Sequence, residues 1–364
     1  MQLSSLQSDK EWSALLGEFP PSFDFSASAQ SHGALQRLRK IRSGEDMLRL
    51  ALAYGPCGLS LRQAGAWATA SGLADLSDVA VLKRLRKCGP WLEALCGSLI
   101  DQQIDSAGTF WRNRRVRIAD ATSISGPGSK GTDWRLHASL DLSARCLGQC
   151  ELTDVHGGES LERFSVSAGD IWLADRGYGL ARNLQHLISH QADFVIRLGW
   201  RRLRLQQADG NRFDLFAALE TIKDGETGEW SVLVQGHAGP VFPLRLLVRK
   251  KSAEATGRER HKITAKAAKL PTGRADPRSL IAAEFMILGT SLPDIPSDEI
   301  FALYRLRWQI ELAFKRLKSL IHIDRLPAKD PDLARTWLLA HLLAALIIDR
   351  KSSEFLDSPP CADD

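Results

Sequence analysis

Three acidic residues stand where a carboxylate could hold a divalent cation. Asp120 follows the strand-like run at residues 116–119, and Asp175 follows a second such run at 171–174. A carboxylate at such a position is disfavoured unless it is paired or bound to metal. Together with a helical carboxylate such as Glu311, two strand-end carboxylates can hold two cations about 3.5 to 4 Å apart for chemistry at phosphorus. Carboxylate oxygens suit Mg²⁺ or Mn²⁺.

Glu311 belongs to a polar strip on a predicted helix. At about 100° per residue, Tyr304, Arg307, Glu311 and Lys318 fall within an arc of roughly 60°. The neighbouring sector is apolar and contains Leu303, Leu306, Ile310, Ala313, Phe314 and Leu317. The helix would therefore bury one side and present one carboxylate flanked by cations, which suits a metal and phosphates.

Each of these features also has a purely structural interpretation. Arg307 and Glu311 could form an ordinary surface pair one helical turn apart, worth about 0.2–0.5 kcal/mol. Asp175 precedes a Gly-containing turn and could simply cap a helix. His156 and Glu159 could approach the site from the end of a strand, with Glu159 or Asp154 as a reserve carboxylate, or they could only shape a loop.

The elements that must position these residues alternate in type. Strands are predicted at 115–124, 135–142, 145–154, 170–175 and 193–198, and helices near 160–164 and at 180–190. Three consecutive strands without a helix indicate an antiparallel meander. The following alternation of strand and helix adds parallel strands to it. The predicted class is therefore α/β with a mixed sheet.

The second half of the chain returns to the site after a less regular block. Residues 200–282 are interpreted as an insertion with a strand at 242–249 and a polar, basic stretch at 252–269. A strand at 284–289 follows, and one long helix is expected to begin at Ser297 as its N-cap and to run through Lys318. The apolar run at 337–348 is too short for a bilayer span and predicts a buried helix.

Residues 1–110 have a helical pattern throughout, with breaks at Gly and Pro. Within them, helices at 61–70 and 78–87 could form a helix-turn-helix with a basic second helix. Two packed helices with a solvated basic face explain the same pattern equally well. The expected division is a helical domain at 1–110, a catalytic domain at 111–350 and an acidic tail at 351–364.

Composition fits an ordinary globular protein with a modest basic excess. Lys and Arg number 48 against 43 Asp and Glu, so charge favours nucleic-acid binding only where it is clustered. The clusters are at 37–42, 83–87, 112–117, 201–204 and 249–251. Six Cys without a CxxC pair indicate neither a zinc site nor a disulfide framework. The N-terminus does not resemble a signal peptide, and a cytoplasmic protein is expected.

Taken together, the motifs resemble the DDE transposases of bacterial insertion sequences. Tyr304, Arg307, Glu311 and Lys318 match the Tyr-x2-Arg-x3-Glu-x6-Lys signature that defines a group of the insertion sequence 4 family. The contexts of Asp120 and Asp175 extend the resemblance over roughly residues 110–325. It implies a ribonuclease H-like core, a β-rich insertion before the Glu helix and a helical N-terminal domain that recognises element ends.

The resemblance also implies roles for single residues. Asp120, Asp175 and Glu311 would ligate two Mg²⁺ or Mn²⁺ ions, and Tyr304, Arg307 and Lys318 would position DNA phosphates. Water would cut one strand, and the freed 3′-hydroxyl would attack a second phosphodiester, with a homodimer holding the DNA. Some relatives stack an aromatic side chain on a flipped base, and Trp200 and Trp230 are the candidates here.

Two other functions share these residues. A metal-dependent endonuclease would cleave without strand transfer, and a catalytically silent relative would only bind DNA. No membrane partner is expected.

Overall fold

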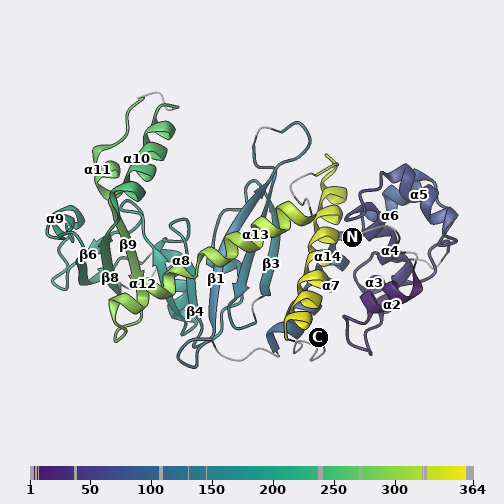
Figure 1. The fold of residues 1–364 in the computed structure, drawn as a ribbon, viewed down its shortest axis with the longest axis horizontal. Helices are drawn as coiled ribbons and strands as arrows, with labels where there is room; N and C mark the ends of the chain where they lie inside the picture. Colours follow the sequence, from purple (N-terminus) through teal and green to yellow (C-terminus); the bar gives the residue numbers. More distant parts are fainter. Residues whose placement is uncertain are drawn as a thin grey trace, which may run out of the picture.

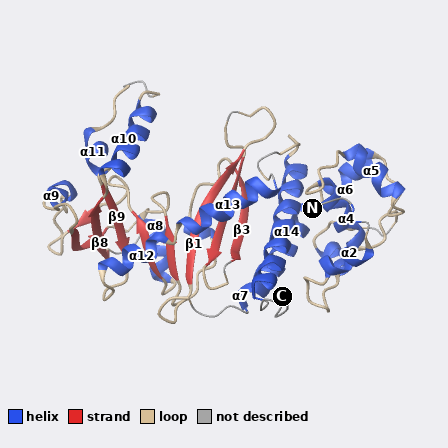
Figure 2. Ribbon diagram, viewed as in Figure 1, coloured by secondary structure: helices blue, strands red, loops and turns tan. Residues whose placement is uncertain are grey.

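A nine-stranded mixed sheet forms the centre of the elongated molecule, with helices on both of its faces (Figures 1 and 2). The structure is a computed structural model of the chain. It describes all residues except 1–3, 5, 7, 37–38, 106–109, 130, 145, 237–240, 270–272, 322, 324–325 and 358–364.

The strand order explains how distant parts of the chain meet. Along the sheet lie β3 (Cys146–Asp154), β2 (Trp134–Asp141), β1 (Val116–Ile124), β4 (Ile171–Ala174), β5 (Asp193–Arg197), β9 (Phe285–Thr290), β8 (Phe242–Lys250), β7 (Thr227–Val234) and β6 (Leu205–Gln206). The β1, β4 and β5 strands are parallel, and every other neighbouring pair is antiparallel. The predicted meander and the two added parallel strands are confirmed.

Successive side chains of the central strands point to opposite faces of the sheet and so contribute to two separate core layers. Ile118 and Leu173 belong to the cluster that α7 (Gly89–Asp105), α12 (Ser297–Arg305), α13 (Trp308–Ile321) and α14 (Pro331–Asp357) share. Ala119 and Trp172 belong to the opposite cluster, beneath η1 (Leu161–Arg163), α8 (Ala181–Ser189) and α9 (Leu215–Glu220). Both faces of β1 and β4 are therefore buried, as expected for parallel strands covered by helices.

The predicted long helix after residue 296 is in fact two helices, α12 and α13. Leu306 and Arg307 form a turn between them, in which backbone N–H groups donate to carbonyls three residues back instead of four. The prediction of Ser297 as N-cap is wrong, because Pro296 occupies that position and no side chain caps the helix. The arc predicted for one straight helix therefore does not describe the site, because Tyr304 lies on α12 and Glu311 on α13.

Residues 200–282 extend the same sheet and do not form a separate one. Three of its strands, β6, β7 and β8, come from this block, as the β-rich prediction requires. The basic stretch forms a helix that was not predicted, α10 (Ala253–Ala267), which pairs with α11 (Pro277–Ala282) in an arm at one end of the molecule (Figure 1). The α10 sequence is polar on nearly all sides and buries only Thr256 and Ala267, so it carries almost no apolar periodicity.

The N-terminal part contains α2 (Asp9–Leu16), α3 (Phe25–Ser31), α4 (Gly44–Tyr54), α5 (Leu61–Ala70) and α6 (Asp78–Leu85). The α5 helix begins with a capping box between Ser60 and Gln63, and Ser77 caps α6, so both predicted helices are confirmed. The next helix, α7, packs against both α14 and β3. Residues 89–105 therefore contribute to the helical layer on the sheet.

The apolar run at 337–348 lies in the longer helix α14. By length and hydropathy, residues Pro331–Lys351 could cross a membrane, but 72% of the apolar window is buried inside the protein. The α14 helix packs against α4, α7 and β3. It is therefore a core helix, as the sequence predicts.

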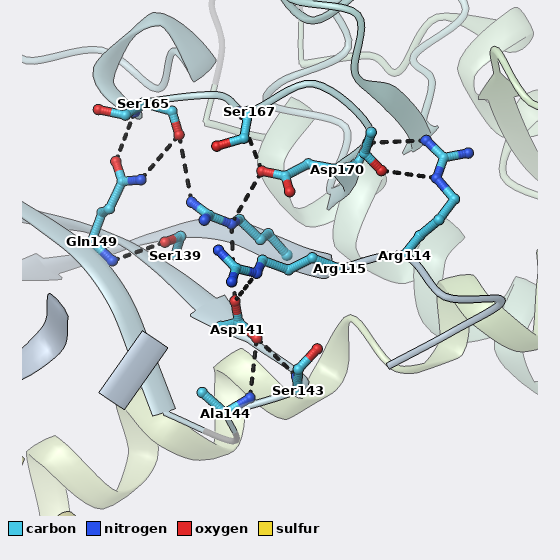
Figure 3. A network of polar contacts seen from close by, with 12 residues as sticks. Arg114, Arg115, Ser139, Asp141, Ser143, Ala144, Gln149, Ser165, Ser167 and Asp170 are labelled. Carbon is cyan, nitrogen blue, oxygen red and sulfur yellow. Dashed lines mark hydrogen bonds and ion pairs between the residues drawn. The ribbon is translucent and has the colours of Figure 1, made fainter. Parts of the chain in front are cut away.

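A buried ionic network fixes the beginning of β1 and β4 (Figure 3). Arg117 lies between two carboxylates, with its Nε 3.3 Å from Asp170 Oδ2 and 4.0 Å from Asp141 Oδ2. Arg115 approaches Asp141 from the other side at 3.5 Å. Burial raises the pKa of Asp170, and the charge of Arg117 lowers it. The network ties the strands together at the end opposite to Asp120 and Asp175.

Candidate active site

Strand register brings Asp120 and Asp175 side by side. Ala119 of β1 is paired with Ala174 of the parallel strand β4, and an Asp follows each of them. Both carboxylates lie two positions after a strand residue of the α13-side core, so both point toward that helix. We call Asp120 and Asp175 the carboxylate pair. Neighbouring carboxylates at the ends of parallel strands are a natural cation site.

Asp120 is largely enclosed, with 18% of its side chain exposed. Its Oδ1 accepts a hydrogen bond from the backbone N–H of Ala121 at 2.8 Å, and its Oδ2 lies 3.5 Å from Arg307 Nη1. The pKa of Asp120 is raised to about 6, chiefly by burial and also by the negative charges of Asp175 and Glu159, against the lowering effects of the Ala121 N–H and of Arg307. Burial of the carboxylate therefore outweighs its contacts with Ala121 and Arg307.

Asp175 begins a tight loop that brings a third carboxylate close. Its Oδ1 accepts a hydrogen bond from Gly177 N–H at 2.7 Å. A Cβ on Gly177 would lie 1.9 Å from Glu159 Oε2 and 3.0 Å from Asp175 Oδ1, so only glycine leaves room for both carboxylates. Burial, followed by the charge of Asp175, raises the pKa of Glu159. The reserve carboxylate Glu159 is thus a neighbour of the carboxylate pair.

Glu311 reaches this region through Arg307. The Arg307 guanidinium pairs with Glu311 one turn later in α13 and also with Asp120, so it bridges the sheet and the helix. Glu311 is more open than Asp120, with 58% of its side chain exposed. The simple surface-pair interpretation is incomplete, because the same Arg307 also contacts Asp120, which is mostly buried.

The donor chemistry of the site suits a hard divalent cation. Carboxylate oxygens come from β1, the loop after β4 and α13, and burial together with neighbouring negative charge raises the pKa of Asp120. Within the part of the chain that the structure describes, no three His, Cys, Asp or Glu side chains are already gathered as a metal site. Arg307 supplies the positive charge between Asp120 and Glu311 instead.

The other two residues of the polar strip differ in exposure. Tyr304 is buried, with 7% exposed, and burial raises its pKa to about 12, so its hydroxyl is protonated at neutral pH. It also interacts with Arg307 and thereby helps to hold the bridging guanidinium. Lys318 lies on α13 two turns after Glu311 and is half-buried.

Two further features of the site were not predicted. Tyr178 is fully buried, its hydroxyl has no hydrogen-bond partner within the described residues, and its pKa is raised by burial and by Asp120, Glu159 and Asp175. The only signal in the sequence was its place in the Asp-Arg-Gly-Tyr run. The second feature is a group of cations that includes Arg176 and lies at the ends of three strands.

The two tryptophans that were candidates for base stacking make contacts within the protein. Trp200 donates from Nε1 to Ser279 Oγ at 3.3 Å and lies between the guanidinium groups of Arg201 and Arg278. Trp230 packs against Phe213 with ring centroids 6.0 Å apart.

In the loop after β3, Asp154 accepts a hydrogen bond from the backbone N–H of His156 at 2.9 Å, and both residues are exposed. Asp154 therefore caps a turn.

Comparison with known proteins agrees with this geometry. The family model for the transposase DDE domain matches residues 111–347. The chain is 40% identical over 365 residues to the putative transposase InsL for insertion sequence element IS186A of Escherichia coli K12, covering 97% of both chains. It is also 40% identical to the transposase for insertion sequence element IS421 of Escherichia coli, again over 97% of both.

A more distant relative matches part of the chain. The transposase for insertion sequence element IS231D of Bacillus thuringiensis subsp. finitimus is 24% identical over 269 residues, which cover 65% of this chain and 55% of that protein. The match over nearly the whole length of the Escherichia coli proteins and the domain match together establish the family. The chain belongs to the DDE-domain transposases of insertion sequences.

Proposed function

We propose that this transposase cleaves DNA at the ends of its insertion sequence and joins the freed ends to target DNA in a metal-dependent reaction. The observation that carries the proposal is the carboxylate pair, which strand register places beneath Arg307 and the adjoining helix α13 that bears Glu311. The matched Tyr, Arg, Glu and Lys spacing supports membership of the insertion sequence 4 signature group. A cytoplasmic location fits a protein that acts on DNA.

Asp120, Asp175 and Glu311 would hold two Mg²⁺ or Mn²⁺ ions. When bound, such ions activate the attacking oxygen and stabilise the leaving oxygen at phosphorus. The chain's own residues prepare for this charge: Asp120 is enclosed, and Asp175 is fixed by the Gly177 N–H. Arg307 pairs with Asp120 and Glu311 in the DNA-free protein. When DNA binds, its guanidinium would leave these carboxylates and contact a phosphate.

Tyr304, Arg307 and Lys318 would position the DNA backbone along α12 and α13. Arg307 is suited to phosphate by its planar donors, and Lys318 by its charge. Buried Tyr304 would act mainly by holding Arg307. Substituting Arg307 or Lys318 by Ala should weaken DNA binding and lower its salt dependence by about one phosphate contact. Unchanged binding and cleavage would contradict this assignment.

The domain division follows from the same proposal. We propose a ribonuclease H-like core over residues 111–350, interrupted at about 200–282, with residues 1–110 recognising element ends and residues 351–364 forming a tail. The α5 and α6 helices would serve as the helix-turn-helix, since Lys83 and Arg84 lie in the last turn of α6. A homodimer would hold two ends together.

An endonuclease without strand transfer and a silent DNA-binding relative are the alternatives. Glu311→Gln, Asp120→Asn and Asp175→Asn should each abolish Mg²⁺-dependent cleavage while retaining binding to the element's terminal repeat. The matched control is Glu299→Gln, because Glu299 lies on α12 and pairs only with the exposed Arg112 among the described residues. Full cleavage by any of the three site variants would contradict its role, and no cleavage by the wild type would favour the silent relative.

A further inference from the structure

Three cations at or just after the ends of three different strands converge on a single carboxylate of the α10 arm. Glu259 Oε1 lies 3.5 Å from Arg176 Nη1 and 3.3 Å from Arg197 Nη2, and Oε2 lies 3.9 Å from Lys251 Nζ. We call Arg176, Arg197 and Lys251 the cationic cluster. Three positive charges and one negative charge leave a local excess of positive charge.

The cationic cluster lies at the same edge of the sheet as the carboxylate pair. Arg176 directly follows Asp175, and Arg197 is the last residue of the neighbouring parallel strand β5. Lys251 follows the end of β8. Because β9 is antiparallel to both β5 and β8, these two strands run in the same direction, and the end of β8 lies at the same edge as the end of β5. A DNA strand bound at Asp175 would therefore lie near Arg176, the member of the cluster next to it in the chain.

Arg197 and Lys251 are more enclosed than an ordinary solvated basic face, whereas the Arg176 side chain is 51% exposed. The side chain of Lys251 is 12% exposed, and those of Arg197 and Glu259 are 23% and 21% exposed. Burial, Arg197 and Arg176 together lower the pKa of Lys251 to about 8 against the raising effect of Glu259, and burial is the largest cause. A second anion would relieve this repulsion.

We propose that the cationic cluster binds a backbone phosphate of DNA and that Glu259 occupies this position in the DNA-free protein. The inference rests on the proposed function and adds to it an internal competitor that DNA must displace. A carboxylate and a phosphodiester each carry one negative charge, and arginine binds both. None of the three contacts of Glu259 is shorter than 3.3 Å.

The α10 arm is built to allow the exchange. The helix buries only two of its residues, so little apolar surface holds it in place. Displacing the Glu259 side chain would break its three ionic contacts, whereas Arg260 would still hold α10 through Glu284 and the Leu280 carbonyl. The competing explanation is that Glu259 merely clips α10 to the sheet.

The test compares Glu259→Gln with Glu254→Gln in the full chain. Glu254 also lies on α10 and pairs with an arginine, Arg258, but far more openly, with 81% of its side chain exposed. Binding of a labelled duplex is followed by fluorescence anisotropy at several salt concentrations. Glu259→Gln should bind about three- to tenfold more tightly and steepen the salt slope by about 0.9, the value for one phosphate contact. Glu254→Gln should match the wild type.

A second substitution confirms which cation is responsible. Adding Lys251→Gln to Glu259→Gln should remove most of the gain. Equal binding by Glu259→Gln and Glu254→Gln would overturn the inference, as would a fall in melting temperature without a change in DNA affinity, which is the result of a structural clip. Stabilisation of Glu259→Gln by inorganic phosphate with an unchanged DNA slope would also overturn it. Loss of all DNA binding by the wild type would instead refute the proposed function.

Discussion

Substituting Asp120 by Asn should stabilise the metal-free protein while it abolishes catalysis. Asp120 is more enclosed than Glu311, with 18% of its side chain exposed against 58%, and its folded-state pKa of about 6 lies above the ordinary value of 3.8. An acid with a raised pKa favours folding when protonated, so it lowers stability as pH rises from about 4 through 6. Asparagine keeps the shape and an oxygen for the Ala121 N–H, but it carries no charge.

The magnitude follows from the difference between the two pKa values. At about 1.36 kcal/mol per unit, ionised Asp120 costs about 3 kcal/mol of unfolding free energy at pH 7.5. At pH 4 the folded state is almost entirely protonated, whereas the unfolded state is a little more than half ionised, and the cost falls to about 0.5 kcal/mol. The expected stabilisation by Asp120→Asn therefore grows with pH and levels off above about pH 7.

Urea unfolding with a chelator present, at pH 4.5, 6 and 7.5, measures this difference. Adding Mg²⁺ should stabilise the wild type and leave Asp120→Asn unchanged, because only the ionised residue binds metal well. An Asn variant that is equally stable or less stable than the wild type at pH 7.5 would refute the electrostatic description of the site. So would a stabilisation that does not change with pH.

Two further substitutions test the surroundings of the site. Arg117→Leu should destabilise the fold by about 3–5 kcal/mol in urea unfolding, because it leaves the buried Asp170 without its cation, whereas Arg112→Leu at an exposed pair should change stability by less than about 0.5 kcal/mol. Gly177→Ala should slow Mg²⁺-dependent cleavage at least about tenfold, since its Cβ would collide with Glu159. Removing the Glu159 carboxylate in Gly177→Ala should restore activity, and a double variant as slow as Gly177→Ala would contradict the steric explanation.

Local patterns were sufficient for the central sheet. Apolar runs of strand length, separated by Gly and Ser turns, identified the meander and the two parallel strands. The same patterns placed Asp120 and Asp175 at equivalent strand positions, which the register now brings together. Periodicity failed for α10, because a helix that is polar on nearly all sides has no apolar stripe to detect.

Other features depend on tertiary contacts that no local pattern contains. The turn at Leu306 and Arg307 replaces one continuous helix by two, although both residues are good helix formers, and it lets Arg307 reach Asp120 across the sheet. The gathering of Arg197 and Lys251 around Glu259 requires strands that are distant in sequence to end at one edge. Spacing alone could not show either arrangement.

The most direct test of the central claim is a product analysis with purified protein, Mg²⁺ and a duplex that carries the element's own terminal repeat. Denaturing and native gels separate cleaved DNA from DNA joined to a target. We predict joined products with the wild type and none with Glu311→Gln, which should still bind the repeat. Cleaved DNA that is never joined, or joined products that persist in Glu311→Gln, would contradict the account.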